Sequence, residues 1–281
     1  MSLSSPFEPK TLTSLRQFAI AIIEEKRPAH KVLLARQAAD LWAKGALPAY
    51  CRLEKPLLPL SPGRPERPQL LPPRKMPKRK ASSRSGLIAL IHALVHIELN
   101  AIDMAFDLIA RWCDAGLPPD FLHEAVRIGL EEAQHFTMIN KRLEELGAGY
   151  GDLPAHGNLW EAVCDTRHDL LARLTLVPLI LEARGLDVSP KMMAQLKAQG
   201  NTEMAATMEI IYREEITHVA FGVKWFTFLC EQRGLVPQQQ FQTLAKKYFK
   251  GTLQPPFNKK ARQMAGLKEE FYQNLTETGE I

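Results

Sequence analysis

Two Glu-x-x-His units stand in the chain, and each follows a lone glutamate by nearly the same distance. The lone glutamates precede the glutamates of the units by 34 and 33 residues. Together they form a repeated set of four carboxylates and two imidazoles: Glu98, Glu132, His135, Glu182, Glu215 and His218. Four-helix bundles hold two metal ions between their helices with this ligand set. The pattern therefore predicts a dinuclear metal site inside a helical bundle.

A single Glu-x-x-His match is common by chance, so the prediction depends on the surroundings of each match. Residues three or four apart share one face of a helix. The face of Glu132 carries apolar or small neighbours: Ala125, Ile128, Gly129, Phe136 and Ile139. The faces of Glu98, Glu182 and Glu215 are similar. A buried carboxylate must be paired or must bind a metal. The alternative is that these are surface glutamates with apolar neighbours, but that would not account for the matched spacings.

Other residues near the units offer supporting roles. Glu131 and Glu214 each precede the glutamate of a unit and are expected to accept the second N–H of a histidine, within the helix or across to the other unit. A solvated helix face is the alternative for both. Tyr212 lies one turn before Glu215 and is a candidate catalytic residue, redox-active or hydrogen-bonding, with a packed core tyrosine as the alternative. Arg184 is expected to pair with a carboxylate or to anchor a substrate.

Composition indicates an ordinary globular protein. The 281 residues include 46% hydrophobic ones, enough for one large core with appendages. Residues 1–12 have no apolar stretch of the secretory kind, and no run is long enough to span a membrane. The four cysteines are scattered without a Cys-x-x-Cys pair, which argues against zinc or iron–sulfur ligation and predicts a cytoplasmic protein.

The net charge of +5 is concentrated in one segment. Residues 52–85 hold ten Lys or Arg against two Glu, a local balance of +8, so the remainder comes to −3. Eight prolines between Pro56 and Pro77 exclude helix there and favour an extended path. The segment is expected to strap the bundle through its arginines, with phosphate binding as the alternative. It lacks aromatic residues for base stacking.

The periodicity of apolar residues predicts an all-α chain in four parts. Two N-terminal helices over 1–50 pack on the bundle, 51–85 is the extended Pro/Arg-rich segment, and 86–234 forms a ferritin-like four-helix bundle with further helices over 235–281. The bundle helices are expected over about 85–114, 120–147, 160–184 and 201–233. Pro178 should kink the third helix next to Glu182.

With these residues in hand, the chain resembles a bacterial family of ferritin-like proteins classed as a domain of unknown function. The resemblance covers most of the chain and is carried by the runs Pro62-Gly63-Arg64-Pro65, Pro72-Pro73-Arg74 to Pro77, His92 to Ile102, Glu182-Ala183-Arg184-Gly185-Leu186-Asp187, His218-Val219-Ala220-Phe221-Gly222 and Trp225-Phe226. More distantly it is similar to the di-iron hydroxylase that modifies a hypermodified adenosine in tRNA. That similarity implies oxygen chemistry by analogy.

Hard carboxylate oxygens with one imidazole per metal suit two iron ions, or manganese with iron. The leading hypothesis is an O2-activating oxidase or monooxygenase, in which Glu132 and Glu215 bridge the metals. We expect a small-molecule substrate, an unidentified electron donor, a homodimer and no membrane. Three alternatives stay open: a ferroxidase or iron-handling protein, an RNA-modifying hydroxylase, and a non-enzymatic protein whose metal site is structural.

Overall fold

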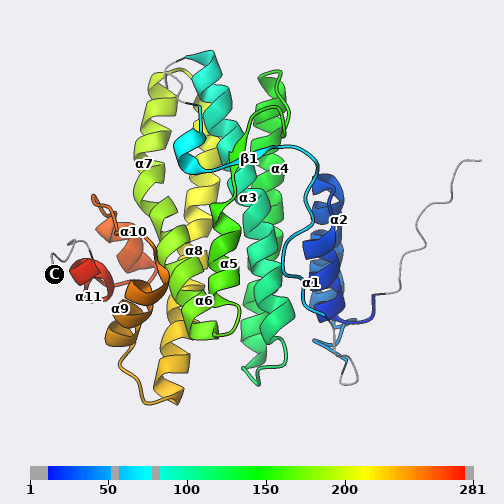
Figure 1. Cartoon of the computed structure of the whole chain (residues 1–281), viewed down its shortest axis with the longest axis vertical. Coiled ribbons are helices and arrows are strands. Elements are labelled where there is room, and N and C mark those ends of the chain that lie inside the picture. The colour runs from blue at the N-terminus through cyan, green and yellow to red at the C-terminus, as the bar shows by residue number, and fades with distance from the viewer. Residues whose placement is uncertain (1–11, 52–56, 78–82, 276–281) are drawn as a thin grey trace, which may run out of the picture.

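The structure, a computed structural model, describes residues 12–51, 57–77 and 83–275, and nearly all regular structure in these ranges is helical (Figure 1). Long helices run side by side at its centre: α3 (Arg84–Trp112), α4 (Pro119–Glu145), a composite helix of α6 (Leu170–Leu176), η2 (Val177–Glu182) and α7 (Ala183–Ala198), and α8 (Thr202–Gln232). Helix α3 packs along α4, α7 along α8, and α4 against α8. The predicted all-α bundle is confirmed.

Local sequence signals set the ends of these helices. The Ser83 hydroxyl caps α3 by accepting a hydrogen bond from the N–H of Gly86 at 3.0 Å. Pro119 opens α4, where its missing N–H is harmless because first-turn donors have no helical partner. Gly147 follows the end of α4 with a φ of +75°, which glycine adopts without the steric cost that other residues carry. Helices α3 and α4 therefore begin and end at the residues that carry these signals.

The third long helix differs from its predicted range of 160–184. The structure starts a new helix at Leu170 and carries it on to Ala198, so Glu182 lies in the middle of a composite helix. Pro178 has no N–H for the α-helical ladder, and the π-helical turn η2 accommodates it. The distortion that the sequence predicted next to Glu182 is present, and Glu182 is its last residue.

Helix α8 approaches this π-helical turn closely at Gly222. A Cβ at position 222 would lie 2.6 Å from the Cβ of Pro178 and 3.3 Å from a methyl group of Leu179. Real Cβ atoms do not approach so near, so only glycine lets the two helices meet here. Because Glu182 ends the turn, this contact helps to set the distance between Glu182 and α8.

Shorter helices cover two sides of the bundle. Helices α1 (Leu15–Glu24) and α2 (Pro28–Ala43) pack against α3 and α4, and the buried ion pair of Lys31 with Asp103 fastens α2 to α3. On the opposite side lie α9 (Pro237–Tyr248), α10 (Lys259–Met264), α11 (Glu269–Tyr272) and the 3-10 turn η3 (Gln273–Leu275). The flanking helices therefore lie outside the four long helices, among which α3 contacts α4, α4 contacts α8 and α7 contacts α8.

The proline-rich segment runs along the bundle as an extended strap over residues 57–77 (Figure 1). Arg64 donates a hydrogen bond to the Asn100 side chain of α3 at 2.8 Å. Strand β1 (Leu70–Leu71), followed by the 3-10 turn η1 (Pro73–Lys75), pairs in parallel with β2 (Ala155–His156), which precedes helix α5 (Asn158–Thr166). The sequence had not indicated this short pairing. Residues 52–56 and 78–82 of the +8 segment lie outside the described residues.

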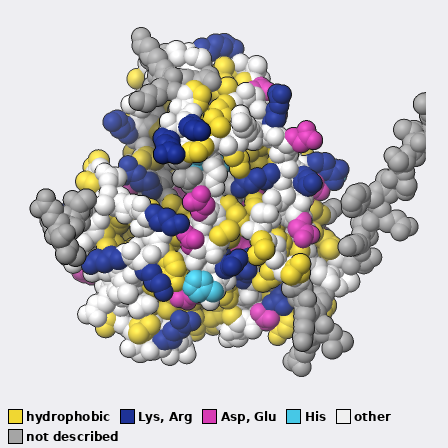
Figure 2. Space-filling view, viewed as in Figure 1, with side chains coloured by type: hydrophobic (Ala, Val, Ile, Leu, Met, Phe, Trp, Pro, Cys, Tyr) yellow, Lys and Arg dark blue, Asp and Glu magenta, His cyan; other side chains and the backbone are white. Residues whose placement is uncertain are grey.

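The molecular surface seen in Figure 2 carries Lys and Arg side chains scattered among acidic and apolar ones. Helix α3 is long and apolar enough to cross a membrane by length and composition, with a mean hydropathy of 1.6 over its most apolar window. Within the bundle, however, 61% of that window is buried. A central core helix of a soluble protein has these properties.

Replacing Gly222 by alanine should weaken the contact between α8 and η2. Overpacking a tight contact costs about 1–3 kcal/mol, which exceeds the roughly 1 kcal/mol that alanine gains over glycine in a helix. We expect a net loss of up to about 2 kcal/mol in the free energy of unfolding, measured by urea denaturation. Gly185→Ala on α7 is the matched control, because a Cβ there meets no atom within 4 Å. Equal stability of the two variants would contradict this account of the contact.

Candidate metal centre

The structure brings the six predicted ligands together from four elements of the bundle. Helix α3 supplies Glu98, α4 supplies Glu132 and His135, the end of η2 supplies Glu182, and α8 supplies Glu215 and His218. Their ligand atoms form two groups, each with all atoms within 4.8 Å of one another. The first group is Glu98, Glu132, His135 and Glu215, and the second is Glu182, Glu215 and His218. Glu215 belongs to both groups.

Glu132 lies between the two imidazoles. Its Oε2 is 3.4 Å from Nδ1 of His135, and its Oε1 is 3.1 Å from Nδ1 of His218. Two other glutamates each approach one imidazole. Oε2 of Glu98 lies 3.5 Å from Nδ1 of His135, and Oε2 of Glu215 lies 3.7 Å from Nδ1 of His218. A cluster of oxygen and nitrogen donors around two shared carboxylates is an arrangement that can hold metal ions.

The outer nitrogen of each histidine binds a carboxylate of the opposite helix. Nε2 of His135 on α4 lies 2.6 Å from Glu214 of α8, and Nε2 of His218 on α8 lies 2.8 Å from Glu131 of α4. A carboxylate accepts, so each Nε2 carries the proton and donates it. Each Nδ1 is then left facing the cluster with its lone pair free once the ring is neutral. The sequence allowed each acid to bind the histidine of its own helix or that of the other unit. The structure has the second, crossed arrangement.

Several inward-facing atoms of the cluster are buried without a hydrogen bond. Among the described residues these include Oε2 of Glu132 and of Glu215, and Nδ1 of His135 and of His218. A buried polar group without a partner is costly, so such groups are rare in folded proteins. Here they are oxygen and nitrogen atoms of the kinds that bind metals, and their residues belong to the two groups of candidate ligands. The residues present therefore fit a metal ion.

Burial and charge shift the pKa values of the cluster in opposite directions. Desolvation raises the pKa of Glu98 to about 8, and it raises that of Glu182 well above its usual range, helped by the charge of Glu215. Desolvation would also raise the pKa of Glu132, but the two imidazoles outweigh it and lower that pKa. Neighbouring carboxylates raise the pKa of His135 to about 11 despite its burial. The cluster therefore concentrates negative charge that protons or cations must neutralise.

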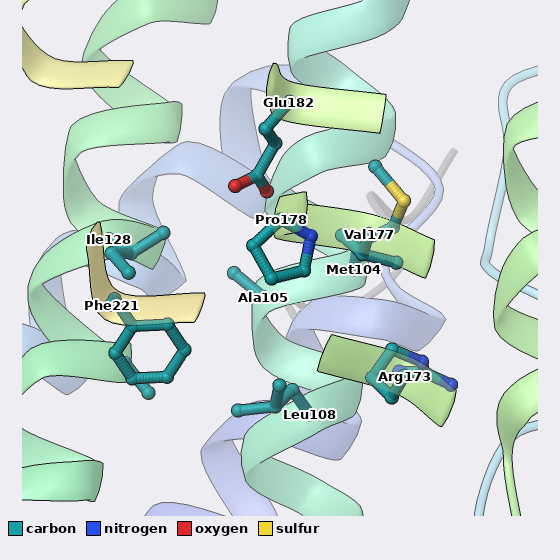
Figure 3. A pocket seen from close by; sticks show the side chains of 10 residues that line it. Met104, Ala105, Leu108, Ile128, Arg173, Val177, Pro178, Glu182 and Phe221 are labelled. Atoms are coloured by element: carbon teal, nitrogen blue, oxygen red, sulfur yellow. The ribbon is translucent and has the colours of Figure 1, made fainter. Parts of the chain in front are cut away.

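A small cavity of about 30 Å³ adjoins Glu182 between α3, α4, the composite helix and α8. Figure 3 shows Glu182 at one end and Arg173 at the other, with Val177 and Pro178 between them. The guanidinium of Arg173 is fully buried and bound to Asp107, Thr166 and the carbonyl of Val163. The rest of the lining is apolar: Met104, Ala105, Leu108, Ala125, Ile128 and Phe221. The volume suits a molecule the size of water.

Tyr212, the candidate catalytic residue, is hydrogen-bonded to the C-terminal segment. Its hydroxyl accepts a hydrogen bond from Nδ2 of Asn258 at 2.8 Å, and within the described residues no hydrogen bond joins it to the six ligands. Arg184, the candidate substrate anchor, donates to the carbonyl of Gln254 at 2.7 Å and lies 3.7 Å from Asp187. Sequence reasoning missed Asn258, because it stands far along the chain in a segment without a recognisable motif.

Comparison with known proteins identifies the family of the chain. Residues 24–273 match the family described as "Protein of unknown function (DUF455)", so the chain belongs to that family. A Haemophilus influenzae protein described as "Uncharacterized protein" is 37% identical over 214 residues, which cover 73% of each of the two chains. No solved structure matches. These matches confirm the expected bacterial family of unknown function.

The crossed carboxylates yield a test of the site. Glu214→Ala removes the acceptor that orients His135, and loss of such a partner typically lowers metal affinity about 10- to 100-fold. We expect that loss in a titration with Co(II). The side chain of Glu214 is 33% exposed, so water can replace it and the fold should persist. Glu209→Ala, which removes only a surface pair with Arg213 on the same helix, is the control. Equal affinity of both variants would show that Glu214 has no such role.

Proposed function

We propose that the chain is a ferritin-like protein with a dinuclear metal centre held by all six ligands. Glu98 and His135 would bind one metal, Glu182 and His218 the other, and Glu132 and Glu215 would bridge them. The observation that carries the proposal is the set of buried, unpartnered Nδ1 and carboxylate atoms that face one another, backed by crossed acids on the outer nitrogens. Two Glu-x-x-His helices with two further glutamate helices make up this type of site.

Iron is the metal that the donors favour, with manganese alongside it as the second choice. Four carboxylates and two imidazoles are hard or intermediate ligands, whereas thiolates would favour zinc or copper. None of the four cysteines belongs to the two ligand groups, and burial raises the pKa of Cys113 and Cys230 to about 11. Reduced cysteines also agree with the cytoplasmic location that we propose.

The reaction that we propose is O2 activation by an oxidase or monooxygenase. Iron supplies one-electron and oxygen chemistry that no side chain offers. The chain contributes the orientation of both imidazoles through Glu131 and Glu214, and a largely apolar wall beside Glu182. The adjoining cavity of about 30 Å³ has room for a molecule about the size of water. A small-molecule substrate and an electron donor complete the proposal.

A nucleic-acid substrate has less support from the structure. Arg64, in the basic segment, is engaged with Asn100 of the bundle, and Arg84 donates to the carbonyl of Leu146. Both contacts agree with the strap expected from the sequence, whose arginines bind the bundle. Four described basic residues of the segment are exposed, Arg67, Arg74, Lys75 and Arg84, but the segment has no aromatic residue on which bases could stack. We therefore favour a small-molecule substrate over RNA.

Metal content tests the proposal directly. Protein expressed with iron and manganese available should contain about two metal ions per chain by elemental analysis. Glu132→Ala removes the carboxylate between both imidazoles and should abolish most of this metal. Glu144→Ala, an exposed glutamate near the end of the same helix, is the matched control and should retain it. Metal-free wild-type protein after reconstitution, or metal unaffected by Glu132→Ala, would refute the proposal.

A further inference from the structure

A second buried polar cluster joins α7 and α8 to the C-terminal segment. Asp187 of α7 has a fully buried side chain, and Arg262 of α10 binds both of its oxygens, with Nε 2.9 Å from Oδ1 and Nη2 2.7 Å from Oδ2. The guanidinium lies between two aromatic rings, 4.8 Å from the centroid of Phe257 and 4.5 Å from that of Tyr272. Ion pairing and cation–π contacts together hold α10 in one position against α7.

Asn258 connects three helices through one side chain. Its backbone N–H donates to Oδ1 of Asp187 at 2.9 Å, and its Nδ2 donates to the carbonyl of Leu186 at 3.1 Å and to the hydroxyl of Tyr212 on α8 at 2.8 Å. Its Oδ1 caps α10 by accepting from the N–H of Ala261 at 3.2 Å. All hydrogen-bonding atoms of this side chain are therefore used, which fixes its orientation.

The helices that Asn258 joins carry two metal ligands. Glu182 ends η2 immediately before α7 begins, five residues before Asp187. Tyr212 stands three residues before Glu215 on α8, so the two side chains share a helix face. Glu182 and Glu215 belong with His218 to the second ligand group. Within the described residues, the side chains of Asn258, Asp187 and Arg262 make no hydrogen bond or ion pair with α3 or α4.

From this arrangement we infer that Asn258, held by the Asp187–Arg262 pair, is a positioning residue for one of the two metal positions. By tying the start of α7 to α8, it sets the separation of Glu182 from Glu215 and hence the affinity of the position that they share with His218. The other position also uses Glu215, but its remaining ligands, Glu98, Glu132 and His135, come from α3 and α4. This inference rests on the proposed dinuclear centre.

The variant Asn258→Asp removes the two hydrogen bonds that Nδ2 donates, to the carbonyl of Leu186 and to the hydroxyl of Tyr212. It keeps the shape and the cap of α10, but it places a carboxylate oxygen against the carbonyl of Leu186 and adds charge beside Asp187. The test is a titration of the full-length protein with Co(II), followed by visible absorption. Wild type should bind two ions. In the variant one ion should bind about 10- to 100-fold more weakly, as for other lost supports of metal ligands. The second ion should bind as in wild type.

Two further variants make the result specific. Tyr212→Phe removes only the hydrogen bond from Asn258 to α8. It should weaken the binding of the same ion and change the same absorption band. Gln263→Ala, exposed on α10, is the control and should bind both ions normally. Normal binding of both ions by Asn258→Asp and Tyr212→Phe would overturn the inference while leaving the metal centre intact. Failure of wild type to bind Co(II) would overturn the proposed function and this inference together.

Discussion

The structure depends on neutralising several carboxylates inside one helical bundle. Isolated charges are very costly away from water, and removing one member of a buried charged set leaves the others uncompensated. Glu132 meets this constraint between two imidazoles, whereas burial raises the pKa of Glu98 and Glu182 so that they resist ionising without a cation. The proposed metal ions would supply the missing positive charge. The packing around the cluster keeps the distances between its carboxylates and imidazoles fixed.

Different contacts position each helix that contributes to the cluster. The crossed acids Glu131 and Glu214 fix the imidazoles by hydrogen bonds between α4 and α8. On the composite helix, the π-helical turn brings Glu182 to the cluster, and Gly222 of α8 lets this turn approach. The C-terminal segment then ties α7 to α8 through Asn258. Helix α3 is held separately, by the buried pair of Lys31 with Asp103 and by the strap.

Much of the fold and cluster could be predicted from the sequence, because a helix converts spacing into direction. The Glu-x-x-His units and their matched glutamates identified all six residues that the structure brings together, and Pro178 identified the distortion beside Glu182. The bounds of the third helix were wrong at both ends, because the helix breaks between Thr166 and Leu170 and α7 continues through Gly185 and Pro190 to Ala198. Asn258 and Arg262 could not be found, since they meet α7 about 70 residues away in sequence and no local pattern encodes that contact.

Anomalous diffraction from crystals grown with iron tests the central claim most directly. Data collected above and below the iron absorption edge should show two peaks between α4 and α8, about 3.5–4 Å apart, as in other two-metal sites. Glu132 and Glu215 should contact both peaks, and the two Nδ1 atoms one each. A single peak, a peak away from these residues, or a metal-free cluster hydrogen-bonded within itself would contradict the account.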